Sequence, residues 1–297
     1  MNLRPLFMSC FGALGIASFL LTSCEQPSTT GTSNTTGVDS NSVSSSGTVK
    51  LEGQIISIPS PNQLAALMRQ SNIPFKAEIL HNLAKRETYL SEQKKAMNLG
   101  VYGTDLAYIA NFEKAQLAND YFDVVGKLAG ELEVLDHIDS RLVNRLSSNI
   151  SQRDSVLRLS SQFFQSADRY LKNNERSDLA GLILLGGWIE SVYLACEPAQ
   201  TNEEIKQRIG EQKHACASLL NLINNFQDPS MDQLKKDMKA LNDVYSELES
   251  TYSYQKPITD TKEKRTYFTS KTSVKVSAEQ LAEIARRIQA IRTIIIQ

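Results

Sequence analysis

The sequence predicts an all-α protein whose body is an irregular multi-helix bundle. Helix-start signals recur along this body. In each of them a Ser or Thr is followed three residues later by Asp, Glu or Gln. Apolar residues at steps of three or four form a continuous stripe in the last segment. The residues of this stripe are Leu281, Ile284, Ile288, Ile291 and Ile295. No repeat of fixed period is visible, which favours a single irregular bundle over a solenoid.

The elements follow one another along the body, residues 50–297. The start signals belong to Ser60, Ser151, Thr201, Ser230 and Ser277. We expect helices over residues 61–71, 76–96, 103–127, 138–149, 152–173, 178–196, 202–226, 230–252 and 278–295. Two stretches, 50–58 and 266–276, look extended. One short β pair between them that joins the N- and C-terminal ends of the body is a further hypothesis.

The first 24 residues predict export and lipid attachment. Arg4 supplies a positive start, and the apolar run that follows is shorter than the roughly 20 residues of a membrane span. The run ends in Leu21-Thr22-Ser23-Cys24, which resembles the lipobox of bacterial lipoproteins. The resemblance implies that residues 1–23 are a removed signal peptide. It also implies that Cys24 carries fatty acyl chains such as palmitate.

Residues 24–49 differ in composition from everything that follows them. Ser, Thr, Gly and Asn dominate this segment, and it has almost nothing apolar to bury. Such a composition is typical of a flexible tether. We therefore expect a single helical domain, residues 50–297, held at some distance from a membrane.

Charge and cysteine content exclude several classes of function. Removing residues 1–23 leaves 31 basic and 33 acidic side chains, so no basic surplus points to nucleic acid. In the body only Cys196 and Cys216 remain, on predicted helices whose geometry would separate them by some 20 Å. We expect two buried thiols that form no disulfide.

The segment 98–112 combines two glycines, an acid and two tyrosines. It reads NLGVYGTDLAYIANF, and we expect a break between helices at its glycines. In the simpler interpretation, Thr104 caps the second helix and Asp105 lies in its first turn, where the helix dipole favours a negative charge. In the functional interpretation, Tyr102, Asp105 and Tyr108 surround a small polar pocket.

The segment 179–189 is eleven residues without a charge, followed by Glu190. This length is too short for a bilayer but fits a helix buried on all sides. Gly186 and Gly187 would let a neighbouring helix approach closely. If Glu190 is buried, it needs an Arg, a Tyr or a cation as partner. If it lies at the helix edge, which is the interpretation we prefer, it needs none.

These segments carry a resemblance to a known group. The stretches IPSP at Ile58, NLGVYGTDLAY at Asn98 and GGWIESVY at Gly186 are similar to those of uncharacterised envelope lipoproteins from Bacteroidetes-type bacteria. The similarity runs from about residue 50 to the C-terminus. It implies an exported helical domain anchored in a Gram-negative envelope, most simply at the outer membrane, and it implies no reaction.

Signatures of catalysis do not occur in the sequence. The histidines His81, His137 and His214 lack metal-ligand spacing, and neither a nucleophile elbow nor a phosphate loop is present. We therefore expect no cofactor, no metal and no nucleic-acid partner. The leading hypothesis is a non-enzymatic module that binds another envelope protein or helps assemble a complex.

Two alternatives stay open. The first is a small-ligand receptor whose pocket is lined by Tyr102, Asp105, Tyr108, Trp188 and Glu190. It requires the segments 98–112 and 179–193 to meet around a cavity. The second is a hydrolase with a cryptic site, which requires a nucleophile and a base within hydrogen-bond reach.

Overall fold

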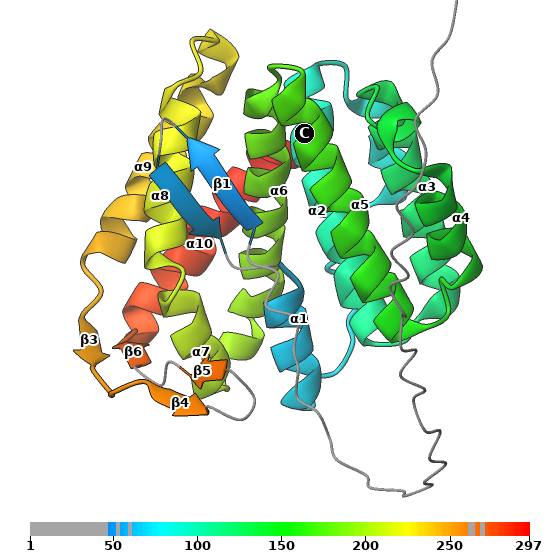
Figure 1. The fold of residues 1–297 in the computed structure, drawn as a ribbon. Coiled ribbons are helices and arrows are strands. Elements are labelled where there is room, and N and C mark those ends of the chain that lie inside the picture. Colours follow the sequence, from blue (N-terminus) through cyan, green and yellow to red (C-terminus); the bar gives the residue numbers. More distant parts are fainter. Residues whose placement is uncertain (1–46, 52–53, 59–60, 261–264, 268–270) are drawn as a thin grey trace, which may run out of the picture. The chain divides into compact units, whose positions relative to one another are not determined.

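The described part of the chain is a helical bundle with a few short strand pairs (Figure 1). The structure is a computed structural model that describes residues 47–51, 54–58, 61–260, 265–267 and 271–297. The predicted signal peptide, Cys24, most of the predicted tether and the predicted cap Ser60 lie outside these residues. The predicted all-α, multi-helix class is confirmed.

The helices make up most of the described chain. The α-helices are α1 (Pro61–Gln70), α2 (Glu92–Asn111), α3 (Ala115–Glu131), α4 (Ser140–Ser148), α5 (Arg153–Asn173), α6 (Ser177–Cys196), α7 (Glu203–Gly210), α8 (Lys213–Asn224), α9 (Asp232–Ser246) and α10 (Ala278–Ile296). Short 3-10 turns are η1 (Leu83–Thr88), η2 (Leu135–His137), η3 (Pro198–Gln200) and η4 (Pro229–Met231).

Helices α2 and α6 form the centre of the bundle and approach each other closely. A methyl group at Gly100 would lie 2.0 Å from the Ile183 carbonyl oxygen, and one at Gly186 would lie 1.9 Å from the Met97 carbonyl oxygen. Only glycine fits where two backbones are this close. The predicted role of Gly186 as a point of close helix approach is confirmed.

The remaining helices pack around this pair on two sides (Figure 1). Helices α3 and α5 pack against α2, and α4 lies on α5. Helix α10 contacts both α6 and α9, and α8 packs on α9. Among the described helices, only α6 is long and apolar enough to cross a membrane. However, 89% of its apolar window is buried in the protein, as predicted for a helix surrounded on all sides.

Two predicted helix boundaries near α2 are wrong. Helix α2 runs without interruption through the predicted break, because Gly100 and Gly103 provide space for packing instead of a turn. At Gly103 an added methyl group would lie 2.3 Å from the Phe164 ring. The chain turns later, where Glu113 has a φ of 57°. The predicted helix 76–96 begins only at Glu92, where the Ser91 side chain caps it.

Further outcomes concern helix ends, caps and the two cysteines of the body. The predicted helix 202–226 is divided into α7 and α8, and α9 ends before the predicted residue 252. The capping box at Ser277 is confirmed, whereas Asn202 caps α7 in place of Thr201. Cys196 and Cys216 are buried and form no disulfide, as predicted.

The strands pair in a pattern that the sequence did not predict. They are β1 (Gly47–Leu51), β2 (Gln54–Ile58), β3 (Ser250–Ser253), β4 (Ile258–Asp260), β5 (Arg265–Tyr267) and β6 (Lys271–Val274). Antiparallel pairs form between β1 and β2, β3 and β6, and β4 and β5. Each extended stretch therefore pairs with a nearby segment, and among the described strands none joins the two ends of the body.

Candidate functional sites: a buried charge cluster and an arginine hollow

The first candidate site is a group of charged side chains in the bundle core. Asp105 from α2, Glu190 from α6 and Arg292 from α10 are all buried. The segments 98–112 and 179–193 therefore meet in space, as the receptor hypothesis requires. The segment that connects α1 and α2, residues 71–91, is irregular apart from η1 and packs on this group. We call it the strap.

Glu190 and Arg292 form a bidentate ion pair. Arg292 donates from Nε to Glu190 Oε2 at 2.6 Å and from Nη2 to Oε1 at 2.8 Å. The Arg292 guanidinium also lies over the Tyr193 ring, 4.1 Å from its centre. Both charges are thereby compensated inside the core, as buried ions require.

Asp105 has no cation of its own and is expected to be protonated. Burial, followed by the nearby Glu190 charge, raises the pKa of Asp105 well above its usual range. Its Oδ2 accepts a hydrogen bond from the His81 amide at 3.0 Å. Its Oδ1 makes no hydrogen bond of normal geometry to a described atom, so this oxygen is free to carry the proton toward Glu190. The group of three then has no net charge, since Glu190 and Arg292 cancel.

Buried side chains of the bundle hold the strap in place. The Tyr121 hydroxyl donates to the His81 carbonyl at 2.7 Å, and the Tyr102 hydroxyl donates to the Asn82 carbonyl at 2.8 Å. The His81 ring hydrogen-bonds the Tyr89 hydroxyl through Nε2. Burial lowers the pKa of His81 to about 3, so the ring is neutral at physiological pH.

The other two predicted site residues do not join this group. The Tyr108 hydroxyl accepts a hydrogen bond from the Lys76 amide, and its ring stacks on Phe75 of the strap. Trp188 donates from Nε1 to Gln212 Oε1 at 3.0 Å. Two residues along a helix are about 200° apart around its axis, so Trp188 and Glu190 point to different sides of α6.

The simpler interpretations of Asp105 and Glu190 are both wrong. Asp105 lies deep within α2 and not in a first helical turn, because the predicted break at the glycines does not exist. Thr104 is not a cap and donates instead to the Gly187 carbonyl at 3.0 Å. Glu190 is not at the helix edge, since its exposed fraction is 0%. Its partner is an arginine, one of the three kinds that the sequence analysis named for a buried position.

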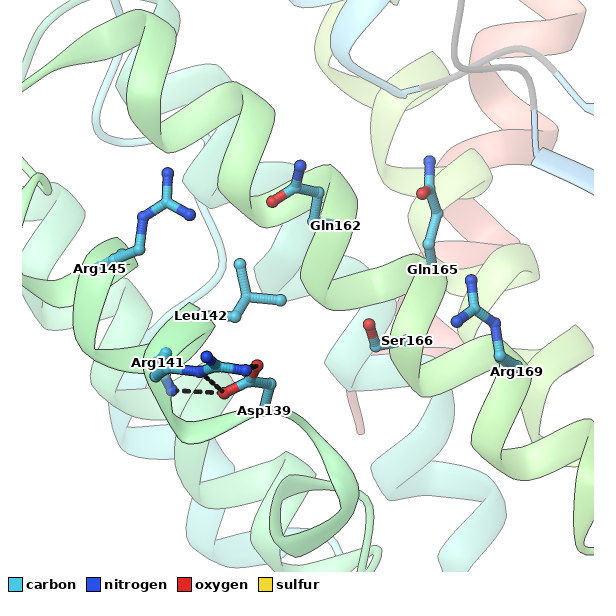
Figure 2. A pocket seen from close by; sticks show the side chains of 8 residues that line it. All are labelled: Asp139, Arg141, Leu142, Arg145, Gln162, Gln165, Ser166 and Arg169. Carbon is cyan, nitrogen blue, oxygen red and sulfur yellow. Dashed lines mark hydrogen bonds and ion pairs between the residues drawn. The ribbon is translucent and has the colours of Figure 1, made fainter. Parts of the chain in front are cut away.

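The second candidate site is an open hollow of about 480 Å³ between α4 and α5, and none of the predicted site residues lines it. Figure 2 shows Arg145 at one end and Arg169 at the other, with Leu142 and Ser166 between them. The remaining lining residues are Asp139, Arg141, Gln162 and Gln165.

The arginines of the hollow differ in how they are paired. Asp139 caps α4 by accepting from the Arg141 amide, and it also accepts from the Arg141 guanidinium at 2.8 Å. These hydrogen bonds from Arg141 lower the pKa of Asp139. In contrast, the guanidinium groups of Arg145 and Arg169 are exposed and contact no acid among the described residues. The hollow thus offers two uncompensated guanidinium groups.

Arg292 and the hollow were both missed by the sequence analysis, although each has a signal in the sequence. Arg292 is a single cation within the apolar stripe of α10, four residues after Ile288 and three before Ile295. A charge on such a stripe implies a buried partner. Residues 139–176 hold seven basic and four acidic side chains, within a chain whose net charge is −1.

Comparisons with protein families, with curated proteins and with solved structures found no match to this chain. The fold and the two sites thus define a class in structural terms only: a helical bundle with a compensated charge cluster in its core and a basic hollow on its surface.

Proposed function

We propose that this protein is an exported lipoprotein, anchored in the bacterial envelope through Cys24, whose helical body is a non-enzymatic binding or assembly module. The observation that carries the binding role is the α4–α5 hollow with its two uncompensated arginines. Anchoring is supported by the lipobox-like sequence at Leu21–Cys24 alone. The outer membrane is the simplest location for such an anchor.

The buried cluster supports a structural role instead of a catalytic one. Each charge in it is either paired or expected to be neutral, and the polar groups above it hold the strap. A reaction centre would need an acid, base or nucleophile that a substrate can reach. The arrangement of Asp105, Glu190 and Arg292 instead supports a core that fixes a long irregular segment.

The anchor is tested by replacing the predicted lipid-bearing cysteine. Cys24→Ala is expected to abolish acylation and to release the body from membranes, measured by mass spectrometry of the N-terminal peptide and by fractionation. Cys10→Ala is the matched control, because this cysteine lies within the predicted signal peptide and should leave acylation intact. Membrane attachment of Cys24→Ala without acylation would show that a protein contact holds the chain.

The binding role is tested by affinity purification of the acylated protein from detergent-solubilised native envelopes, with Cys24→Ala as control. A stoichiometric partner that is lost or weakened in the control supports an assembly module. Absence of any partner would contradict it.

The small-ligand receptor remains an alternative because Asp105 and Glu190 do converge, covered by one irregular segment. It requires the strap to open, since the side chains beneath it are buried. Hydrogen exchange of the His81 and Asn82 amides tests this requirement. A metabolite that slows their exchange would favour the receptor, whereas exchange only on global unfolding would oppose it.

A further inference from the structure

We infer that the α4–α5 hollow binds an extended, carboxylate-rich segment of a protein partner. The inference rests on the proposed function and names the chemistry of the partner. Five side chains carry the argument: Arg145, Arg169, Gln162, Gln165 and Leu142.

The charge of this region supports an acidic occupant. The basic excess of residues 139–176 contrasts with the slightly negative chain as a whole. Lys172 and Arg176 are paired with Asp168 and Glu92, so the excess is carried by Arg145, Arg158 and Arg169, and two of these three line the hollow. A local positive field of this kind attracts and orients acidic partners.

The side-chain types support carboxylates in particular. A guanidinium is a planar group whose parallel N–H donors match the two oxygens of a carboxylate. Gln162 and Gln165 line the same hollow and carry both donors and acceptors, which suits the amides of a peptide backbone. Leu142 supplies an apolar contact near the Arg145 end of the hollow (Figure 2).

The shape supports an elongated segment over a small anion or a membrane surface. Arg145 and Arg169 lie at opposite ends of the hollow, so one small anion would leave one of them uncompensated (Figure 2). A membrane is flat, whereas these side chains line a concave surface between two helices. A peptide with separated acidic side chains matches both features.

The test is the affinity of the purified acylated protein, in detergent, for a fluorescein-labelled peptide of alternating Glu and Ala. A peptide of the same length with Gln for Glu is the neutral control. The wild-type protein is expected to bind only the acidic peptide. Arg145→Glu/Arg169→Glu should weaken this binding about tenfold or more, because each lost pair is replaced by a repulsive one.

A matched variant separates the hollow from general charge. Lys127 and Lys236 are exposed and have no acidic partner among the described residues, so Lys127→Glu/Lys236→Glu makes the same change in net charge elsewhere. It should change the affinity less than threefold. Arg145→Lys/Arg169→Lys keeps the charge but loses the planar donor geometry, so an intermediate loss is expected. Circular dichroism verifies that each variant is folded.

Three outcomes would overturn the inference. The acidic peptide could fail to bind, the control variant could weaken binding as much as the arginine variant, or anionic lipid vesicles could bind through Arg145 and Arg169 while the peptide does not. None of these outcomes affects the acylation of Cys24 or the recovery of a partner from envelopes. Failure of the inference is therefore distinguishable from failure of the proposed function.

Discussion

Two substitutions of one chemical kind, Glu190→Gln and Asp105→Asn, are expected to have very different effects. Each replaces a buried carboxyl group by an amide of nearly the same shape. Among the described residues, Glu190 is the only acid that pairs with Arg292, and the Arg292 side chain is 7% exposed. Removing the charge of Glu190 leaves a buried cation uncompensated, which costs about 3–5 kcal/mol.

Asp105→Asn should cost no more than about 1 kcal/mol of stability. A protonated Asp105 is neutral, accepts from the His81 amide and can donate toward Glu190. Asparagine reproduces each of these properties. The assay is urea unfolding at pH 7, followed by circular dichroism, with the free energy of unfolding compared between the wild type and both variants.

The pH dependence adds an independent check of the same assignment. The fold retains the Asp105 proton, while the unfolded chain releases it near pH 4. The contribution of Asp105 to the stability of the wild type therefore falls as the pH rises from about 4 through the raised pKa of the folded state. Asp105→Asn lacks this loss, so its stability should increase relative to that of the wild type over the same pH range. An equal, large cost for both substitutions would refute the protonation of Asp105.

Three further predictions concern stability and reactivity. Gly186→Ala should destabilise the fold by roughly 2 kcal/mol, because the Met97 carbonyl must move. Gly126→Ala, with open space around it, should be neutral or stabilising in the same thermal unfolding assay. His81 is neutral in the fold, so its own contribution to the stability should fall by roughly 4–5 kcal/mol as the pH drops from 6.5 to 3, opposite in direction to the contribution of Asp105; His81→Gln should remove this contribution in urea titrations. Burial raises the pKa of Cys196 to about 12 and that of Cys216 further, so a thiol reagent at pH 8 should label them only on unfolding. Rapid labelling of the native protein would contradict their placement in the core.

The sequence predicted the elements whose signals are local. The apolar stripe and capping box of α10 defined that helix within two residues, because both depend on spacing along the chain. The uncharged run of α6 likewise predicted a buried helix. In these cases the residues that decide the structure lie within the element itself.

The strap and the glycines show why the rest could not be predicted. Glycine at 100 and 103 has the same local signature whether it permits a turn or a close helix contact. The choice depends on Ile183 and Phe164, which are distant in the sequence. The strap is likewise fixed by side chains from α2 and α3, whose hydroxyl groups donate to its backbone carbonyls. These contacts override the local pattern that predicted a helix from residue 76.

The candidate site was predicted in part. Asp105 and Glu190 were named and do meet, but Arg292 was absent from the prediction because the pair spans 102 residues. The surface hollow depends on how α4 and α5 pack together, so counting charges in the sequence indicates only that the region is positively charged.

The most direct test of the central claim is photo-crosslinking from Gln162 in cells that produce the protein natively. Gln162 is exposed and lines the hollow, so a photoreactive residue there reports what occupies it. The expected result is one adduct, mapped by mass spectrometry to an Asp- and Glu-rich segment of a partner protein and lost in Arg145→Glu/Arg169→Glu. The claim would be contradicted by an adduct that forms equally well from a photoreactive residue placed at Lys127, or by one that persists in the arginine variant.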